Sequence, residues 1–381
     1  MLAYSHKDIE ALRHHVKAKT WLRNGIISKE EHDSILKEFP CRLYRVKIAF
    51  RILLFLAAII CVQGIIGLMG VAFIGAFEDY LYIPLWIIGL LLMVVNEFMF
   101  IKEKFHFRTG LVQGVYYSGL AYILGGVVYL IQDFSTPLTI IFTLLFLIIS
   151  IRYLDRFALI LSILFLNATI FLIFNSLDGN ARFIVPFILA LVNGGVYLII
   201  KKVSEEESLK SWREMTKLVQ YLALILAYLG LNLFVVQEGA NNLLGLNGDV
   251  PFKWLFIFFT LVIPFIYLYF AVKNRNRMLL RTGMFTLALG IAAIKYYYST
   301  GHHEITFTIT GIILLAIAIY LIRKYKNPID GITSEKVEGK GSALFAVLLA
   351  AQAEGQSELP KPDEGIMGGG QFGGGGGGSS F

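Results

Sequence analysis

Arg42-Leu-Tyr-Arg45-Val-Lys47-Ile-Ala-Phe-Arg51 leads without a break into an uncharged apolar run over residues 52–74. At about 1.5 Å per residue in a helix, this run is long enough to cross the roughly 30 Å hydrocarbon core of a bilayer. Positive charges beside a first span stay in the cytoplasm, so these four cations orient the helices that follow. The stretch predicts an uncleaved membrane anchor with its N-terminal side in the cytoplasm.

Further apolar stretches continue the same pattern along the chain. Hydrophobic residues make up 56% of the 381 residues and charged residues 16%, against about 25% charged residues in soluble domains. The predicted spans cover residues 52–74, 81–101, 111–131, 137–151, 157–174, 183–200, 218–236, 254–272, 282–298 and 305–322. We therefore expect an all-α, polytopic membrane bundle of ten helices over residues 41–323, with both termini in the cytoplasm.

The distribution of positive charge agrees with this topology. With the N-terminus inside, 31 of the 34 lysines and arginines fall in cytoplasmic segments, and the outer side keeps Arg182, Lys253 and Lys295. A missed or invented span would scramble this alternation from that point on. The net charge of +7 therefore reflects topology. We expect no nucleic-acid partner, because no basic face interleaved with aromatic residues occurs.

Two loops of this topology invite local predictions. In the cytoplasmic loop over residues 201–217, Ser204 is followed by three glutamates, which predicts a helix that starts there and runs into the seventh span. The outer loop over residues 237–253 is rich in Asn and Gly. Two interpretations of it remain open, an ordinary surface loop and a re-entrant or lid segment.

Residues 1–40 predict a small soluble hairpin of two helices. The first helix carries a narrow apolar stripe, and Gly25 is well placed to end it in a left-handed turn. Ser28 with Glu31 forms a capping box for the second helix, which Pro40 stops. Because helices this short are marginal alone, we expect them to dock on each other, on the membrane face or on a partner.

The string Trp21-Leu-Arg-Asn-Gly25-Ile-Ile27-Ser28-Lys-Glu30-Glu31, followed closely by many spans, resembles a known family. It is similar to the start of bacterial membrane proteins grouped as domain of unknown function 2157. The resemblance covers about thirty residues. It implies a bacterial membrane location and no particular activity.

Ionisable and amide side chains inside the spans are the candidate functional residues. Glu97, beside Asn96, is either an interfacial structural acid paired with Lys102 or Lys104, or an acid that couples ion or proton movement. Lys295 precedes three tyrosines, which is typical of a snorkelling lysine, although a substrate-facing cation is the alternative. Amides also occur at Gln63, Gln113, Asn167, Asn193, Gln220 and Asn232. They either link helices or, if they converge on one cavity, bind a polar solute.

Small residues recur at helical spacing in two of the spans. Gly110, Gly114 and Ser118 repeat every four residues, whereas Gly64, Gly67 and Gly70 repeat every three. Such spacings predict close helix contacts.

The sequence offers little for catalysis or metal binding. No zinc-protease helix motif is present, and the seven histidines lie outside the predicted spans. His302, His303 and Glu304 are adjacent in one short loop, which is the wrong spacing for converging ligands. We therefore expect no catalytic residue, no metal and no cofactor.

The chain after residue 323 is a polar tail over residues 324–381. It holds a short apolar segment, residues 343–352, and a glycine-rich end in which Phe372 and Phe381 are the only aromatic residues. So much glycine opposes ordering, so the end is expected to be disordered when free. The tail is either a flexible terminus or a docking tag in which Phe372 and Phe381 bind a partner.

These observations favour a non-enzymatic subunit or scaffold of a bacterial inner membrane. Its partners would be the lipid bilayer and a membrane or cytoplasmic protein held by the N-terminal hairpin and the C-terminal tail. The alternative is a secondary transporter of a small uncharged or amphiphilic solute, whose route the amide-bearing spans would line. Amides gathered on one cavity would favour transport, and amides dispersed over helix contacts would count against it.

Overall fold

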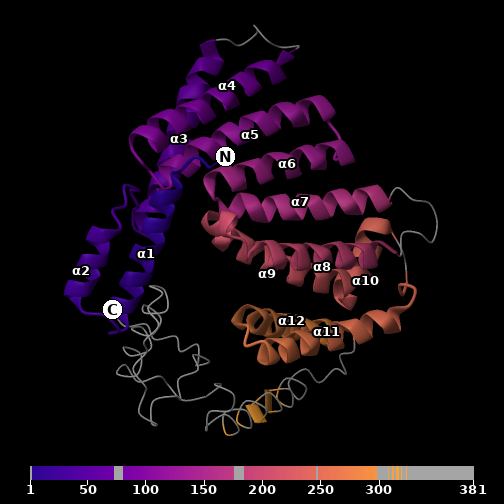
Figure 1. The fold of residues 1–381 in the computed structure, drawn as a ribbon. Coiled ribbons are helices and arrows are strands. Elements are labelled where there is room, and N and C mark those ends of the chain that lie inside the picture. Colours follow the sequence, from indigo (N-terminus) through magenta and orange to yellow (C-terminus); the bar gives the residue numbers. More distant parts are fainter. Residues whose placement is uncertain are drawn as a thin grey trace, which may run out of the picture. The chain divides into compact units, whose positions relative to one another are not determined.

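The computed structural model describes residues 2–72, 80–175, 184–245 and 248–297, with isolated positions between 308 and 323. This part of the chain is all-α, as predicted (Figure 1). Its helices are α1 (His6–Arg23), α2 (Lys29–Glu38), α3 (Ile48–Ala72), α4 (Tyr82–Val95), α5 (Leu111–Ile131), α6 (Thr136–Tyr153), α7 (Arg156–Asn175), α8 (Val185–Val203), α9 (Arg213–Leu231), α10 (Leu233–Leu244), α11 (Lys253–Lys273) and α12 (Arg277–Tyr297). A π-helical segment, Asn96–Glu103, extends α4, and a 3₁₀ helix, Glu207–Trp212, precedes α9.

Within the described residues, nine helices are long and apolar enough to cross a membrane. They are Ile48–Leu68, Tyr82–Glu103, Leu111–Ile131, Thr136–Tyr153, Arg156–Phe174, Val185–Val203, Leu209–Leu231, Lys253–Lys273 and Arg277–Tyr297. They correspond in order to the first nine predicted spans, so the expectation of a polytopic helical membrane protein is confirmed. Of the tenth predicted span, residues 305–322, the structure describes only isolated positions, so this span stays a prediction.

The seventh predicted span, residues 218–236, was placed wrongly at its end. Helix α9 stops at Leu231, and Asn232 adopts an extended conformation. The Asn232 side chain then accepts hydrogen bonds from the Phe234 and Val235 N–H groups and caps a new helix, α10. Because α10 continues to Leu244, much of the predicted loop over residues 237–253 is helical.

The predicted helix start at Ser204 was also wrong. Ser204 ends α8 instead, and its N–H donates to the Ile200 carbonyl. Its hydroxyl donates to the Lys201 carbonyl and accepts a hydrogen bond from the Gln220 amide of α9. Helix α8 continues past its apolar run through Lys201 and Lys202, because positive charge is favourable at a helix C-terminus.

Helix α5 occupies the centre of the first group of helices. It packs against α3, α4 and α6, and α6 packs against α7 (Figure 1). A Cβ on Gly89 of α4 would lie 2.6 Å from the Gly119 carbonyl of α5, and one on Gly114 would lie 2.6 Å from Ala58 of α3. These glycines therefore allow the close approach of three spans. By contrast, a Cβ on Gly64 or Gly67 would meet no described atom within 4 Å, so the described residues show no close helix contact at these two glycines and their packing role stays a prediction.

Helix α9 holds a comparable position in the second group. It packs against α7, α8, α10 and α11. Its buried Tyr228 hydroxyl donates to the Thr260 carbonyl of α11, and that hydroxyl would meet a Cβ on Gly290 of α12 at 2.9 Å. The second group is therefore also closed around glycine and small polar residues.

The chain divides into two compact units. The larger comprises Met1–Leu12 and Cys41–Ala293, and the smaller comprises Arg13–Pro40 and Ile294–Phe381. In the larger unit, Tyr4 and Ile9 join the buried core with side chains of α5, α6 and α7. The described start of the chain, residues 2–12, therefore packs against the helical bundle.

The described part of the smaller unit includes the end of α1, all of α2 and the end of α12 from Ile294. The predicted capping box of Ser28 and Glu31 is present, and Gly25 has the expected left-handed φ of 67°. A ring N–H of His15 donates to the Phe39 carbonyl at 2.6 Å, and the His14 ring stacks on the Phe39 ring. These contacts hold the two predicted helices against each other.

Candidate functional site

The candidate site lies where α3, α5 and α7 begin and α6 ends, which we call the basic end of the bundle. Tyr44, just before α3, forms an isolated bridge with His106, in the loop before α5. Arg108, in the loop before α5, and Leu154, between α6 and α7, have left-handed φ values of 52° and 54°, which costs a non-glycine residue about 1–2 kcal/mol each. Strained residues persist where surrounding contacts hold them, and such positions are often functional.

Asp155 is the buried acid of this end, with only 4% of its surface exposed. One carboxylate oxygen accepts hydrogen bonds from the Tyr117 hydroxyl at 2.7 Å and from the Phe157 and Ala158 N–H groups at 2.8 and 3.0 Å. The other accepts from the Tyr116 hydroxyl and from the Gln113 amide. Asp155 thereby caps α7 and joins it to α5.

These hydrogen bonds decide the charge of Asp155. Burial raises the pKa of the carboxyl, but the hydrogen bonds from Tyr116, the Ala158 N–H, Tyr117 and Gln113 outweigh burial. The pKa therefore lies below its ordinary value of 3.8, and Asp155 stays ionised at neutral pH.

Gln113 links this carboxylate to a cation. Its amide N–H donates to Asp155 at 3.2 Å, while its amide oxygen accepts from Arg51 Nε at 3.0 Å and from the Gly110 N–H at 3.2 Å. Both halves of the amide are thus engaged, which fixes its orientation. Among the described residues, Arg51 has no carboxylate partner.

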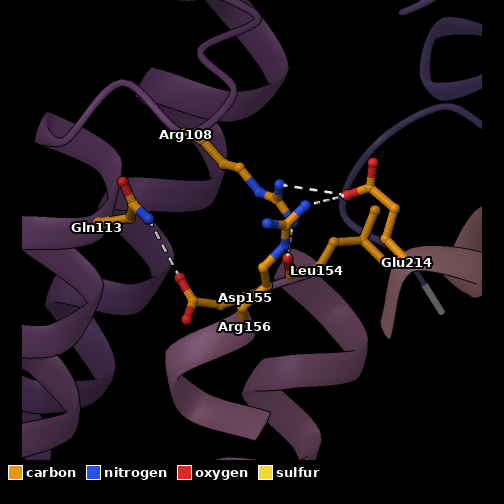
Figure 2. A network of polar contacts seen from close by, with 6 residues as sticks. All are labelled: Arg108, Gln113, Leu154, Asp155, Arg156 and Glu214. Carbon is orange, nitrogen blue, oxygen red and sulfur yellow. Dashed lines mark hydrogen bonds and ion pairs between the residues drawn. The ribbon is translucent and has the colours of Figure 1, made fainter. Parts of the chain in front are cut away.

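Two further arginines share one glutamate. Figure 2 shows the guanidinium groups of Arg108 and Arg156 side by side, both directed at Glu214 of α9. The Arg156–Glu214 pair is 2.6 Å long and the Arg108–Glu214 pair 3.6 Å, and Arg108 also donates to the Leu154 carbonyl at 2.6 Å. Burial, followed by the neighbouring Arg156 charge, lowers the pKa of Arg108.

A partly open pocket of about 430 Å³ lies within this arrangement. Its polar side is formed by Arg51, Arg108, Gln113, Tyr117, Asp155 and Arg156. Its apolar side is formed by Ile48, Ile52, Phe55 and Phe157. Three arginines therefore line a cavity with one carboxylate, whose oxygens already accept five hydrogen bonds.

The pocket is suited to hold an anion. Guanidinium groups match the oxygen geometry of phosphate and carboxylate, and buried charge-assisted hydrogen bonds are among the strongest in proteins. Glu214 neutralises part of the charge of Arg108 and Arg156, while Arg51 keeps its full charge. The pocket consequently has a net positive charge.

The candidate residues named from the sequence do not gather at this pocket. Gln113 is the one that lines it. Asn167 and Asn193 bond each other between α7 and α8, Gln220 bonds Ser204, Asn232 bonds Tyr228, and Gln63 accepts from Tyr122. This dispersal over helix contacts counts against a solute route lined by amides.

The remaining candidates have separate positions. Asn96 is fully buried in the π-helical segment, where its side chain has no hydrogen-bond partner among the described residues. Lys295 lies in the last turn of α12. Phe372 and Phe381 lie outside the described residues, so their docking role stays a prediction.

Glu97 lies in an ion-pair cluster. Arg152 Nε of α6 donates to its carboxylate at 2.9 Å, and Lys102 Nζ lies 3.6 Å from it. The contact with Lys102 agrees with the structural interpretation of this acid, and Arg152 adds a tie between the π-helical segment and α6.

The Glu97–Arg152 pair is expected to contribute measurably to stability. Glu97→Gln should lower the free energy of unfolding by about 1–2 kcal/mol, because the Glu97 side chain is 14% exposed and Arg152 would lose its main partner. Unfolding of Glu97→Gln, Arg152→Gln and the double variant in mild detergent measures the pair. Effects that add without a coupling of about 1 kcal/mol would show that the contact is energetically unimportant.

Sequence patterns missed most of the pocket. Arg51, Arg108 and Arg156 were assigned to topology alone, and Asp155, Tyr116, Tyr117 and Glu214 were not singled out. A signal was present in Leu154-Asp155-Arg156, where an acid and a base fill a very short connection between two spans. An aspartate directly before the first residue of a helix is a common N-cap.

No protein-family model, no curated protein and no solved structure matches this chain. The assignment of a function therefore rests on the geometry of the pocket and on the physical chemistry of its residues.

Proposed function

We propose that this integral membrane protein is a non-enzymatic binding subunit that holds an anionic ligand at the basic end of its helices. The observation that carries the proposal is the convergence of Arg51, Arg108 and Arg156 from three chain segments on one pocket. A cation beside a span is explained by topology, but topology does not require three of them to share a cavity.

Binding is favoured over chemical conversion by the state of the acid. A general base needs a free lone pair and a pKa near the working pH. Both Asp155 oxygens are occupied by donors, and the lowered pKa keeps the group a weak base. Asp155 therefore serves to orient Gln113 and the first turn of α7.

We place the pocket on the cytoplasmic face of a bacterial inner membrane. The proposal is supported by the positive-inside distribution of lysine and arginine, and the resemblance of residues 21–31 to a bacterial membrane family adds to it. The same orientation would leave the N-terminal hairpin and the C-terminal tail in the cytoplasm, available to a protein partner.

The start of the chain provides a link from the pocket towards such a partner. The Tyr4 ring packs edge-on against Phe107, the neighbour of Arg108, with ring centroids 4.9 Å apart. The Ala3 N–H donates to the Arg152 carbonyl, and the His6 ring bonds the Ser211 hydroxyl. A ligand bound at Arg108 would thus affect the packing of the start of α1. We propose that the hairpin and the tail act as the docking elements of a scaffold.

The binding proposal is tested with dodecyl phosphate, a soluble amphiphile with one phosphate group. At about 100 times its dissociation constant, it should stabilise the full-length protein in mild neutral detergent by about 2.7 kcal/mol. Arg51→Gln should remove most of this stabilisation, because Arg51 is the pocket cation without a carboxylate partner among the described residues. Arg45→Gln is the matched control, an exposed arginine near α3 that does not line the pocket. Equal stabilisation of the wild type and Arg51→Gln would contradict the proposal.

A further inference from the structure

We infer that the ligand is an anionic phospholipid, whose phosphate lies among the arginines while its acyl chain leaves along α3 and α7. This inference rests on the proposed function and names the ligand class of the same pocket. It depends on the apolar side of the pocket, on the height of the arginines along the spans, and on the pocket's size and charge.

The apolar side is a continuous strip on two membrane helices. Ile48, Ile52 and Phe55 recur at helical spacing on α3, and Phe157 stands in the first turn of α7. Ile48, Ile52 and Phe157 remain 77%, 57% and 57% exposed, although all three lie in segments apolar enough to cross a membrane. In a bilayer, the exposed surface of Ile52 and Phe157, each one residue deeper than Arg51 or Arg156, would meet lipid chains, so this part of the apolar wall is continuous with the lipid phase.

The arginines lie at the ends of candidate spans, where we expect lipid headgroups. Arg51 is in the first turn of α3, Arg108 lies three residues before α5, and Arg156 is the first residue of α7. Charges at span ends lie in the interfacial region, where phosphates are found. A phosphate in this pocket would therefore keep its acyl chains at their normal depth.

Size and charge favour a lipid over a free phosphate compound. The volume of about 430 Å³ is near the lower end of ligand pockets, enough for a headgroup and the first part of a chain. A small soluble phosphate would occupy the polar side alone and leave the Ile48, Ile52 and Phe55 wall uncovered. The single negative charge of a phosphodiester also matches the one uncompensated cation, Arg51.

The experiment uses full-length protein in nanodiscs made of equal parts phosphatidylglycerol and phosphatidylcholine. After transfer to neutral detergent, native mass spectrometry should detect one retained phosphatidylglycerol per chain. Arg51→Gln should reduce retention about tenfold, the effect of losing one charge-assisted hydrogen bond. The double variant Ile52→Ala with Phe157→Ala should reduce it several-fold by removing apolar wall, whereas Ile60→Ala, at a more exposed position on α3 outside the pocket, should leave it unchanged.

A parallel titration with glycerol 3-phosphate separates a lipid from a free phosphate. Weak binding of glycerol 3-phosphate, together with lipid retention that depends on both the arginine and the apolar wall, supports the inference. The lipid inference is overturned if glycerol 3-phosphate binds tightly through Arg51 and the double variant Ile52→Ala with Phe157→Ala retains as much lipid as the wild type. The proposed function as an anion-binding subunit would remain supported by that result. If Arg51→Gln affects neither ligand, the inference and the proposed function both fail.

Discussion

Replacing Asp155 by alanine is expected to lower the free energy of unfolding by about 3–5 kcal/mol, among the largest single effects in this chain. The substitution removes the acceptor for two tyrosine hydroxyls, the Gln113 amide and two backbone N–H groups at a site that is 4% exposed. Unfolding in mild detergent with increasing dodecyl sulfate, followed by circular dichroism, measures the loss.

Asp133→Ala provides the matched control. Asp133 is an exposed acid after α5, and its replacement should change stability by less than about 0.5 kcal/mol. A loss for Asp155→Ala no greater than that of the control would show that the network does not hold α5 to α7.

The same network has a defined pH dependence, which Asp155→Asn exposes. Because the pKa of Asp155 is lowered in the folded protein, its ionisation stabilises the fold at every pH above its ordinary value of 3.8. That stabilisation is lost as the pH falls below 3.8 and through the folded-state pKa. The stability gap between wild type and Asp155→Asn should therefore be constant from pH 5 to 7 and shrink only in stronger acid. A gap that closes near neutral pH would contradict this assignment.

Gly110→Ala is expected to cost about 3–5 kcal/mol and to abolish the stabilisation by dodecyl phosphate. A Cβ on Gly110 would lie 1.9 Å from the Arg51 carbonyl oxygen and 2.8 Å from its carbon, so the backbone of α3 itself must move. The φ of +88° adds conformational strain for any residue with a side chain. Since the displaced residue is Arg51, both stability and ligand binding should fall.

Gly125→Ala, in the same helix, should have the opposite sign. No described atom lies within 4 Å of a Cβ at Gly125, which is in the interior of α5. Alanine should therefore stabilise the helix by about 0.5–1 kcal/mol through its better helix propensity. If the two glycine variants behave alike, the close approach of α3 to residue 110 is not a stabilising feature.

The spans were predictable because their signals are local. An apolar run of about twenty residues needs a lipid or protein environment whatever it contacts, and flanking cations orient it. The end of α9 was not predictable in this way. An amide such as Asn232 serves equally well as a link between helices or as a helix cap, and its contacts with Tyr228 and the α10 N–H groups decide the outcome.

The pocket depends on contacts between distant segments, which explains why so little of it was predictable. Asp155 looks like a loop acid until Tyr116 and Tyr117, about forty residues earlier, are placed against it. Likewise Arg51 and Arg156 are about a hundred residues apart and line the same pocket only through the packing of α3, α5, α6 and α7. Gln113 was identified because an amide inside a span is unusual in any arrangement.

Glu214 makes the pocket selective among anions. The carboxylate is tethered beside Arg108 and Arg156, so an incoming anion competes with a group whose effective concentration is on the order of millimolar or higher. Chloride and other weakly hydrogen-bonding ions lose that competition, whereas an anion that presents several oxygens to the guanidinium groups can win it. Competition with the Glu214 carboxylate, rather than the shape of the pocket, therefore determines which anions bind.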